Sequence, residues 1–578
     1  MPLEAPPRTR ARPPAPSLLL AAAALLAAPL GAQERRADAA VCEGRRITAV
    51  DVAPAPPPAL GEGVPGWVRP IVRVALQHRT TRPAAVIPFL FTREGDECDP
   101  HDLDESERAL RAQPYLADAE VRAVDDGAGG VRIEVVTVDE IPLVAGVGVR
   151  GGDLSKLKYG SANVFGQGVH AHAQWTRGFA YRDGFGARVV HHHVLGRAIR
   201  LTAAGERARV GGNAALVVER PFYSDFQKVA WHVGGREMRE YVGFVRPDEP
   251  ALSLPYERTL AEAGGILRIG SRSIVLFAGP LLSYERSRPA DEAVVVSDTG
   301  LASDDDPTLD GRYDSFERHA LGGVAGIRLL RFLEVRGFDA LLGPQDAGVG
   351  MQVATALARV AGSGDEGWAA GADLYAGAGT TRSFVVLRTQ WEGRRETSGW
   401  GDVVGSGRLA WYSRPSSGQT MILGAELAGA WRARRPFQLS LGNARGGVRG
   451  YDDTRDVGAR RLVVRAERRW LAGGISDWLA LGVAGFADAG KVWAGDVPYG
   501  VTTGVRTSVG GGLLAAAPRQ SRRLVRVDVA VPLASDPHAA SYSLRLTTSS
   551  PIATFWREPG DIGRVRAVMP SAGLVAWP

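Results

Sequence analysis

The 578-residue chain carries 69 basic and 63 acidic side chains, which gives a net charge of +6. A chain of this length exceeds one ordinary hydrophobic core, so we expect two or more folded units. Its charges nearly balance, whereas a protein that binds nucleic acid through surface charge needs a strong basic excess. The composition therefore argues against a nucleic-acid partner.

The N-terminus has the layout of a secretory signal peptide. Arginines at positions 8, 10 and 12 precede an apolar stretch from Leu18 to Leu30, and small residues lead to a cleavage point after Ala32. The alternative, an N-terminal membrane anchor, needs a longer apolar stretch. We therefore predict a signal peptide over residues 1–32. No later stretch reaches the roughly 18 apolar residues of a spanning helix, so the exported protein is either soluble or a β-barrel.

A small α+β domain is expected over residues 42–140. Apolar residues recur at helical period over Trp67–Ala75, and Asp99 followed by Pro100 is typical of a helix start. Residues 125–127 form the turn between the last two strands. The expected order is strand, helix, helix, strand, strand, and the strands are Arg46–Val52, Ala119–Val124 and Gly130–Asp139.

The two cysteines of the chain, Cys42 and Cys98, both fall in this domain. Export would place them in an oxidising compartment, where a disulfide between them would stabilise the domain by roughly 4 kcal/mol. The alternative is two unrelated buried thiols. We predict the disulfide.

From Ile141 onward, glycine-rich segments alternate with polar turns and no helical period lasts. Within Leu524–Val531 the valines share one face, while Arg526 and Asp528 point to the other. A soluble sandwich also alternates in this way. Two features favour a membrane barrel: charged residues recur on the polar face, and 12 of the 13 tryptophans lie beyond residue 174.

Chain length sets the expected number of strands. Residues 141–578, spread over sixteen strands, leave about 27 residues for each strand and its connection, which suits spanning strands of ~10 residues with alternating short turns and long loops. Counting alternating segments one by one gives about nineteen, with the excess before residue 420. We predict a membrane all-β fold, a 16-stranded antiparallel transmembrane β-barrel preceded by the small α+β domain.

Two motifs in the second half carry a family resemblance. The first is Gly447-Val448-Arg449-Gly450-Tyr451 and the second is Phe486-Ala487-Asp488-Ala489-Gly490. Together they resemble the paired signatures of the BamA/TamA superfamily, which includes the two-partner secretion translocators. In that family the first motif lies at the tip of a loop that folds back into the barrel, here around residues 436–459. The second motif lies on a barrel strand.

The strands expected after the first motif agree with that arrangement, because the family has five there and the second motif falls on the second of them. They are Arg460–Leu471, Trp478–Ala489, Thr503–Ala516, Arg522–Leu533 and Tyr542–Thr548. The first domain is similar to a POTRA domain, the periplasmic module of outer-membrane assembly proteins. In that family it binds extended segments by strand addition at a sheet edge.

The residue types in the two motifs predict how the loop and the strand interact. A guanidinium on an inward loop needs an anionic partner, so we expect Arg449 to pair with Asp488. Gly450 would let the loop tip turn. A solvated loop arginine is the alternative. The candidate site comprises the loop residues Val448, Arg449, Gly450 and Tyr451, the strand residues Phe486, Asp488 and Gly490, and two charged neighbours, Arg465 and Glu467.

The C-terminus departs from the family, whose last strand closes on an aromatic residue. Phe555-Trp556 would supply that residue, but Pro551 interrupts the approach and about twenty residues follow. The position of the closing strand therefore stays open.

Other patterns are weaker. Gly146–Gly151 matches the dinucleotide fingerprint without its βαβ unit, and Gly485–Lys491 resembles a P-loop that lacks its Ser/Thr. His191 and His193 share a strand face without an evident third metal ligand. The acidic segment Ser303–Asp314 is either a solvated loop or a site for calcium or for divalent ions bridging lipid A. We see no catalytic constellation, and we expect no enzyme activity, no cofactor and no metal.

The resemblance implies an outer-membrane protein, with its N-terminal domain in the periplasm, that inserts or translocates other proteins. In the family's mechanism an incoming strand templates on the weak seam between the first and last barrel strands, without nucleotide. The implied partners are the outer-membrane bilayer, unfolded barrel or secreted client proteins, and periplasmic accessory proteins. The alternative is a passive pore or surface antigen, or a dedicated secretion channel for one partner, and the single POTRA domain makes it a serious one.

Overall fold

The computed structural model describes residues 41–42, 44–56, 79–150, 153–178, 180–270, 274–363, 366–396, 399–442, 446–475, 478–534, 536–549 and 560–566. The predicted signal peptide, residues 1–32, and the first predicted helix, Trp67–Ala75, lie outside these ranges. Within them the protein is nearly all β, with few helices. No helix in the described ranges combines the length and the apolar character that crossing a membrane would require.

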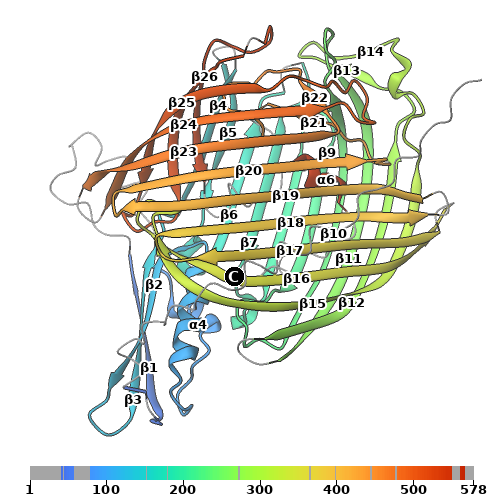
Figure 1. Cartoon of the computed structure of the whole chain (residues 1–578). Coiled ribbons are helices and arrows are strands. Elements are labelled where there is room, and N and C mark those ends of the chain that lie inside the picture. Colours follow the sequence, from blue (N-terminus) through green and yellow to red (C-terminus); the bar gives the residue numbers. More distant parts are fainter. Residues whose placement is uncertain are drawn as a thin grey trace, which may run out of the picture. The chain divides into compact units, whose positions relative to one another are not determined.

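A three-stranded sheet forms the N-terminal part of the described chain (Figure 1). Strands β1 (Ile47–Ala55), β2 (Leu116–Asp125) and β3 (Val131–Asp139) take the order β1-β3-β2. Strand β1 runs parallel to β3, and β2 runs antiparallel to it. These strands lie within three residues of their predicted bounds at most ends, because apolar residues alternate along each of them.

Helix α4 (Pro100–Arg111) packs against β2 and begins where the sequence predicts. The carboxylate of Asp99 accepts the backbone N–H of His101 at 2.9 Å, which caps the first turn beside Pro100. Leu103 and Leu110 are buried in the core between the helix and the sheet. Two 3-10 turns, η2 (Pro83–Ala85) and η3 (Ile87–Phe89), precede the helix.

The remainder of the described chain forms one large antiparallel sheet. Its strands are β4 (Leu143–Arg150), β5 (Asp153–Ser161), β6 (Val169–Thr176), β7 (Gly184–His191), β8 (Arg200–Arg207), β9 (Gly212–Arg220), β10 (Val229–Phe244), β11 (Leu252–Gly270), β12 (Val275–Pro289), β15 (Phe316–Arg336), β16 (Pro344–Gly362), β17 (Gly367–Gly379), β18 (Ser383–Glu396), β19 (Gly399–Ser416), β20 (Gln419–Trp431), β23 (Arg460–Ile475), β24 (Leu479–Trp493), β25 (Arg506–Ala516), β26 (Leu524–Pro532) and β27 (Ser543–Ser549). They follow one another in chain order, and the order returns on itself with β27 next to β4.

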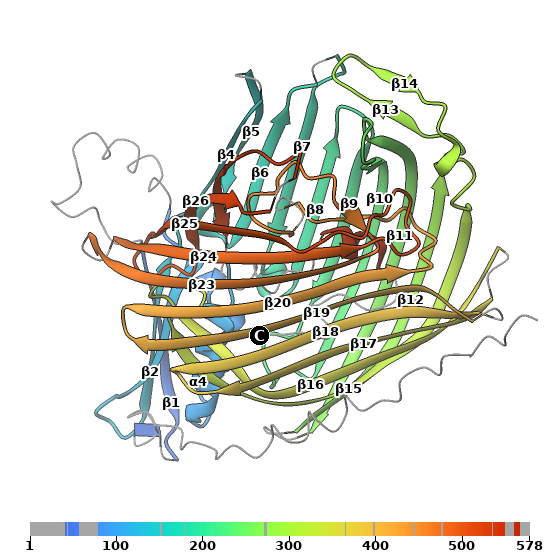
Figure 2. The same ribbon diagram turned by 45° about the horizontal axis from the view of Figure 1, so that its top comes forward.

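Two views show how the strands of the large sheet are arranged, and shorter elements accompany them. Figure 1 shows β15–β20 crossing the front of the sheet and β6–β12 rising behind them, and Figure 2 shows the strands curving around a common interior. The short elements are η4 (Val164–Gly166), η5 (Val194–Gly196), β13 (Val294–Val296), β14 (Leu301–Ser303), η6 (Pro307–Leu309), β21 (Leu439–Ser440), β22 (Val457–Gly458) and α6 (Gly560–Val565).

The number of strands differs from the sixteen that we predicted. In the described residues the large sheet has twenty, besides the short hairpin of β13 and β14. The difference arises early, because β4 to β9 are each 8 or 9 residues long and are joined by short connections. The prediction of sixteen assumed alternating short turns and long loops, and the direct count of about nineteen segments, with its excess before residue 420, is nearer to the observed number. The five strands predicted after Tyr451 are present as β23 to β27.

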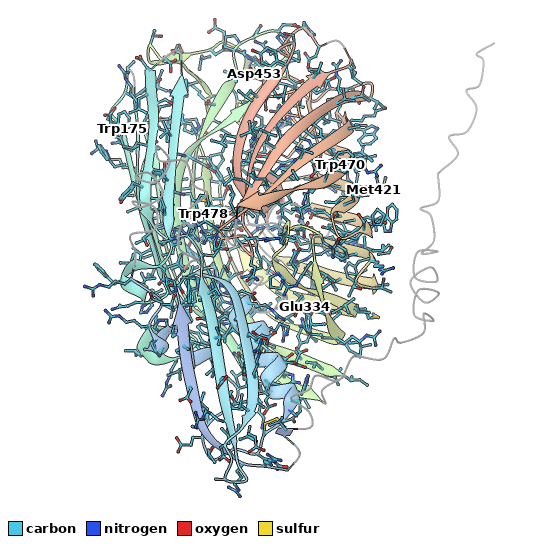
Figure 3. The ribbon with its side chains drawn as sticks, turned by 90° about the vertical axis from the view of Figure 1, so that its left-hand side faces the viewer. Trp175, Glu334, Met421, Asp453, Trp470 and Trp478 are labelled. Carbon is cyan, nitrogen blue, oxygen red and sulfur yellow. A yellow bond between two sulfur atoms is a disulfide. The ribbon has the colours of Figure 1, made fainter. Side chains whose placement is uncertain are left out.

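The two faces of the large sheet differ in polarity. Along β26, Val525, Val527 and Val529 are 43%, 37% and 42% exposed, while Arg526 and Asp528 between them point to the inner face and form an ion pair. Figure 3 shows Met421 and Trp470 on the outer side of neighbouring strands β20 and β23. The outer face is therefore apolar and the inner face is charged.

The last described strand is β27, and Phe555-Trp556 lie outside the described residues. Helix α6 does not join the sheet and instead contacts β19 and β20. The short pair of β21 and β22 also stands apart from the large sheet, within the connection between β20 and β23.

Candidate functional site

The connection between β20 and β23 returns over the inner face of the sheet, and we call residues 432–459 the inward loop. It matches the predicted loop around residues 436–459. Strands β23 and β24 lie beneath it in a register that sets Arg465 opposite Asp488 and Glu467 opposite Phe486. Residues of odd number on β23 and even number on β24 thus face the loop.

Arg449 of the inward loop binds two carboxylates of these strands. Its Nε donates to Asp488 Oδ2 at 2.8 Å and its Nη2 donates to Asp488 Oδ1 at 2.7 Å. Its Nη1 donates to Glu467 Oε2 at 3.0 Å. The bidentate contact fixes the plane of the guanidinium, which a single point charge would not do.

The surroundings of Arg449 keep it charged although it is buried. Its guanidinium carbon lies 3.5 Å from the centre of the Phe486 ring, a cation–π contact, and its side chain is 12% exposed. Burial by itself lowers the pKa of Arg449, but the hydrogen bonds and charge of Asp488 and the charge of Glu467 raise it above its ordinary value. Arg449 is therefore charged at physiological pH.

Glu467 joins three arginines from different parts of the chain. Besides Arg449, it accepts from Arg469 Nε at 2.6 Å and from Arg526 Nη1 at 3.0 Å. Arg526 in turn pairs with Asp528 at 3.0 Å. We call Arg449, Glu467, Asp488, Phe486 and Arg526 the Arg449 cluster.

Glycines allow the inward loop to approach β24. A Cβ at Gly490 would lie 2.5 Å from Val448 Cγ2, so only glycine leaves room for the buried Val448 side chain. Gly450 has a φ of +92° at the loop tip, a conformation that favours glycine. The motif glycines therefore serve the packing of the loop against the strand.

Tyr451 anchors the far side of the loop tip. Its hydroxyl donates to the carbonyl oxygens of Thr507 at 2.9 Å and Ala534 at 3.0 Å, and its side chain is fully buried. Arg465 joins the same network, mainly through the backbone of the loop. It donates to the carbonyl oxygens of Gly446 and Gly447, both at 2.8 Å, and its Nε is 3.9 Å from Asp488 Oδ2.

All the predicted site residues except the cysteines thus meet at one place, the contact between the inward loop and β23–β24. Four members of this contact were not predicted: Arg461, Arg469, Arg526 and Asp528. Arg526 and Asp528 alternate with valines on β26, which marked them as inward-facing, but sequence did not show which loop they would meet. Arg461 is also buried there and donates to the carbonyl oxygen of Ser440 at 2.6 Å.

The remaining predicted features lie elsewhere. Cys42 and Cys98 form a disulfide with an S–S distance of 2.06 Å, visible as the yellow bond in Figure 3. The rings of His191 and His193 are 4.9 Å apart, and His193 Nε2 contacts the carbonyl oxygen of Gln167 at 2.6 Å. Neither pair touches the Arg449 cluster.

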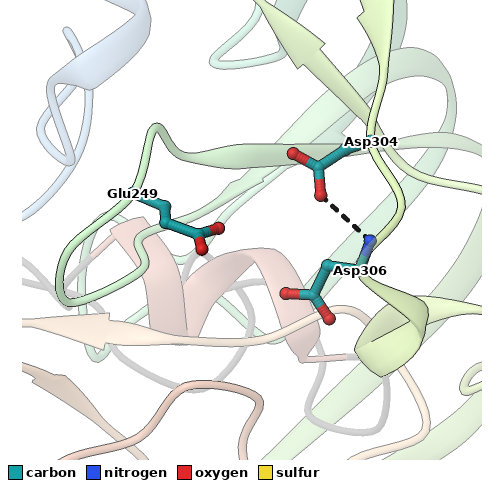
Figure 4. A group of neighbouring side chains, drawn as sticks. All are labelled: Glu249, Asp304 and Asp306. Atoms are coloured by element: carbon teal, nitrogen blue, oxygen red, sulfur yellow. Dashed lines mark hydrogen bonds between the residues drawn. The ribbon is translucent and has the colours of Figure 1, made fainter.

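The acidic segment Ser303–Asp314 contributes two carboxylates to a small group with Glu249 (Figure 4). Asp304 and Asp306 lie beside Glu249, and this is the one such group among the described residues. Arg246 occupies its centre and pairs with Glu249 at 2.5 Å, Asp304 at 2.9 Å and Asp306 at 3.5 Å. A guanidinium thus supplies the positive charge that a metal ion would bring.

The fold and the inward loop define a large antiparallel sheet with a charged interior, and the structural neighbours of the chain are BamA and CdiB. BamA from Haemophilus ducreyi lacking POTRA domains 1–3 has a TM-score of 0.37 and 12% identity, covering 87% of this chain and 83% of that one. CdiB from Escherichia coli has a TM-score of 0.39 and 11% identity, covering 92% and 95%. CdiB from Acinetobacter baumannii has a TM-score of 0.37 and 12% identity, covering 87% and 74%. No protein-family profile and no curated protein matches the sequence.

Proposed function

We propose that the protein is an outer-membrane β-barrel that inserts or translocates other proteins, like BamA and CdiB. On this proposal residues 1–32 are a cleaved signal peptide, and residues 42–140 are a periplasmic POTRA domain. The large sheet of residues 141–578 closes as a barrel between β4 and β27. The observation that carries the proposal is the Arg449 cluster, which holds the inward loop against β24 through the paired motifs.

The apolar outer face supports a membrane location. Large side chains such as Leu357, Leu427 and Leu513 are 55%, 55% and 64% exposed, while Glu426, the inward neighbour of Leu427, is buried. A soluble protein rarely leaves so many apolar side chains of one continuous sheet in water. Lipid covers such a face without cost, and a watery interior suits the charged one.

The proposed seam lies between β4 and β27. Its strands are short, 8 residues in β4 and 7 in β27. Val147 on β4 is 70% exposed, and Leu544 and Leu546 on β27 are 67% and 68% exposed, among the highest values for large apolar residues. A strand whose edge is unpaired offers its backbone N–H and C=O groups to an incoming chain. In the proposed mechanism a client strand templates there, without nucleotide and without a catalytic group.

The implied partners follow from this mechanism. The outer face contacts the outer-membrane bilayer, and the seam receives unfolded barrel or secreted client proteins. The N-terminal sheet receives extended client segments in the periplasm by strand addition, with or without accessory proteins.

The experiment that tests the proposal measures insertion of a model barrel protein into proteoliposomes. Arg449→Ala removes the contact to Asp488 and Glu467, so we expect a several-fold lower insertion rate. The matched control is Arg455→Ala, because Arg455 lies in the same loop but donates to the carbonyl oxygens of Pro247 and Glu249. Equal insertion rates for the wild type and Arg449→Ala would remove the loop from the mechanism.

Depletion in the cell separates the insertase from its alternatives, a passive pore or surface antigen and a dedicated secretion channel. Loss of an insertase lowers the levels of outer-membrane barrels in general. A change confined to one exported protein would favour the dedicated channel, and a change confined to solute flux would favour the pore.

A further inference from the structure

The C-terminal segment Gly560–Arg566 lies against the inner face of the large sheet. The sheet ends at β27, yet helix α6 contacts β19 and β20 on the opposite side of the strand order. Ile562 and Val565, one turn apart on α6, are 0% and 1% exposed. They are buried with Val404, Ala428, Ala430, Phe437 and Leu439, which come from β19, β20 and the inward loop.

Two arginines of the sheet and loop bind the end of α6. Arg435 donates to the carbonyl oxygen of Val565 at 2.9 Å. Arg258 donates to the carbonyl oxygens of Arg564 and Arg566, the latter at 3.0 Å. The last carbonyls of a helix have no partner within it, and cations stabilise that end. Both arginines thus bind backbone carbonyl oxygens at the end of the helix rather than a particular side chain.

A buried carboxylate holds these arginines in place. Glu285 is 2% exposed and accepts from Arg258 at 2.8 Å, Arg318 at 2.8 Å and Arg435 at 2.6 Å. Asp402 lies 3.3 Å from Arg318. Glu285 is on β12, Arg258 on β11 and Arg435 on the inward loop, so the tertiary fold brings these groups together and none of them belongs to the segment.

The segment adds contacts of its own. Arg566 Nη2 donates to the carbonyl oxygen of Gln390 at 3.2 Å, and Arg564 Nε lies 3.7 Å from Glu240 Oε1. Together these reach β10 and β18, so the segment bridges strands that are distant in the sheet order. Two buried apolar side chains and a few hydrogen bonds make a small contact, and the covalent tether to β27 supplies the high local concentration that such a contact needs.

We propose that Arg258, Glu285, Arg318 and Arg435 form a peptide-binding site whose ligand is this chain's own C-terminal segment, and that the docked segment closes the interior of the barrel. The ligand class is a short helix with an apolar pair one turn apart and free C-terminal carbonyls. The proposal rests on the proposed function, because closure requires the sheet to be a barrel in a membrane.

The test compares Ile562→Asp with Gly563→Asp in the full-length protein. Ile562 is fully buried, whereas Gly563 is exposed, so the same charge is added to α6 at a buried and at an open position. Hydrogen exchange of residues 560–566 reports docking, and conductance in planar bilayers reports closure. For Ile562→Asp we expect loss of exchange protection and a rise in open-channel probability of about tenfold. Gly563→Asp should match the wild type.

Several outcomes would overturn the proposal. Free exchange of residues 560–566 in the wild type removes the binding site, and a released segment with unchanged conductance removes the closure. If Ile562→Asp does not fold, as judged by its heat-modifiable band on a gel, the milder Ile562→Ala gives the exchange readout, and a chain ending at residue 559 gives the conductance readout. Failure of the proposed function is distinguishable, because it shows in the insertion assay with Arg449→Ala while exchange at residues 560–566 is unaffected.

Discussion

Gly490 shows how a residue without a side chain positions a charged cluster. It lies on β24 two residues after Asp488, and the missing Cβ is the space that Val448 fills. Leu441 Cδ1 also approaches to 2.9 Å of the Cβ position. The loop can therefore come close enough for Arg449 to reach Asp488 with its Nε and Nη2 atoms.

We predict that Gly490→Ala destabilises the folded protein by about 1–3 kcal/mol, because its methyl group would overpack the buried Val448 contact. The measurement is the unfolding free energy in denaturant after refolding into lipid vesicles. Gly485→Ala is the matched control on the same strand, since its Cβ would meet its nearest neighbour, Trp470, at an ordinary 3.7 Å. Equal losses in the two variants would mean that the Val448 contact carries no special weight.

Among the elements, α4 makes several of the contacts between the N-terminal domain and the large sheet. Arg111 pairs with Asp346 at 2.6 Å and with Glu334 at 3.2 Å, both on strands of the large sheet. Glu105 accepts from Ser224 Oγ at 2.6 Å in the connection between β9 and β10. These side chains are polar yet buried, so the helix has two buried faces, one toward β2 and one toward the large sheet.

The pKa of Glu105 makes this contact sensitive to acid. Burial by itself raises the pKa of Glu105, but the charge and hydrogen bonds of Arg108 and the hydrogen bond from Ser224 lower it below its ordinary value of 4.5. A lowered folded-state pKa adds stability above the unfolded value, and that stability is lost as the pH falls through the folded value.

We therefore predict that Glu105→Gln lowers the thermal unfolding temperature at pH 7, and that its difference from the wild type shrinks as the pH falls below about 4.5. Scanning calorimetry at a series of pH values measures this. Glu120→Gln is the control, because Glu120 is exposed and pairs with the exposed Arg122. A pH-independent difference for Glu105→Gln would contradict the assignment.

At the scale of the whole molecule, polarity divides the large sheet into an apolar outer face and a charged inner face. Buried ion pairs recur on the inner face, and Glu285 and Asp488 each pair there with an arginine. A buried charge without a partner is costly, so pairing lets a charged interior coexist with a folded sheet.

If the outer face lies in lipid, a charge placed on it is costly. We predict that Leu513→Arg, at a side chain that is 64% exposed on β25, destabilises the protein by about 2–4 kcal/mol and lowers its yield in the outer membrane. Leu301→Arg on the short hairpin strand β14 serves as the control, because Leu301 is also exposed, at 48%. If Leu513→Arg leaves the unfolding free energy unchanged, the outer face is in contact with water and not with lipid.

Local patterns predicted much of the fold from the sequence. The start of α4 follows from Asp99 and Pro100, and β23 to β27 follow from residues that alternate with period two, because these signals lie within a few adjacent positions. The strand number was wrong because spacing along the chain does not reveal which connections are short. The pairing of Arg449 with Asp488 came from the resemblance and from charge, and the structure shows both groups in contact.

The sequence by itself determined the alternation of faces and the residues of the two motifs, since each depends on the order of neighbouring residues. Only the tertiary structure decided which distant groups meet. Glu467 gathers Arg449, Arg469 and Arg526, and Glu285 gathers arginines from β11, β15 and the inward loop. Helix α6 packs against both β19 and β20. These contacts join positions far apart in the chain, and their pairing depends on the register and closure of the whole sheet, which no local pattern encodes.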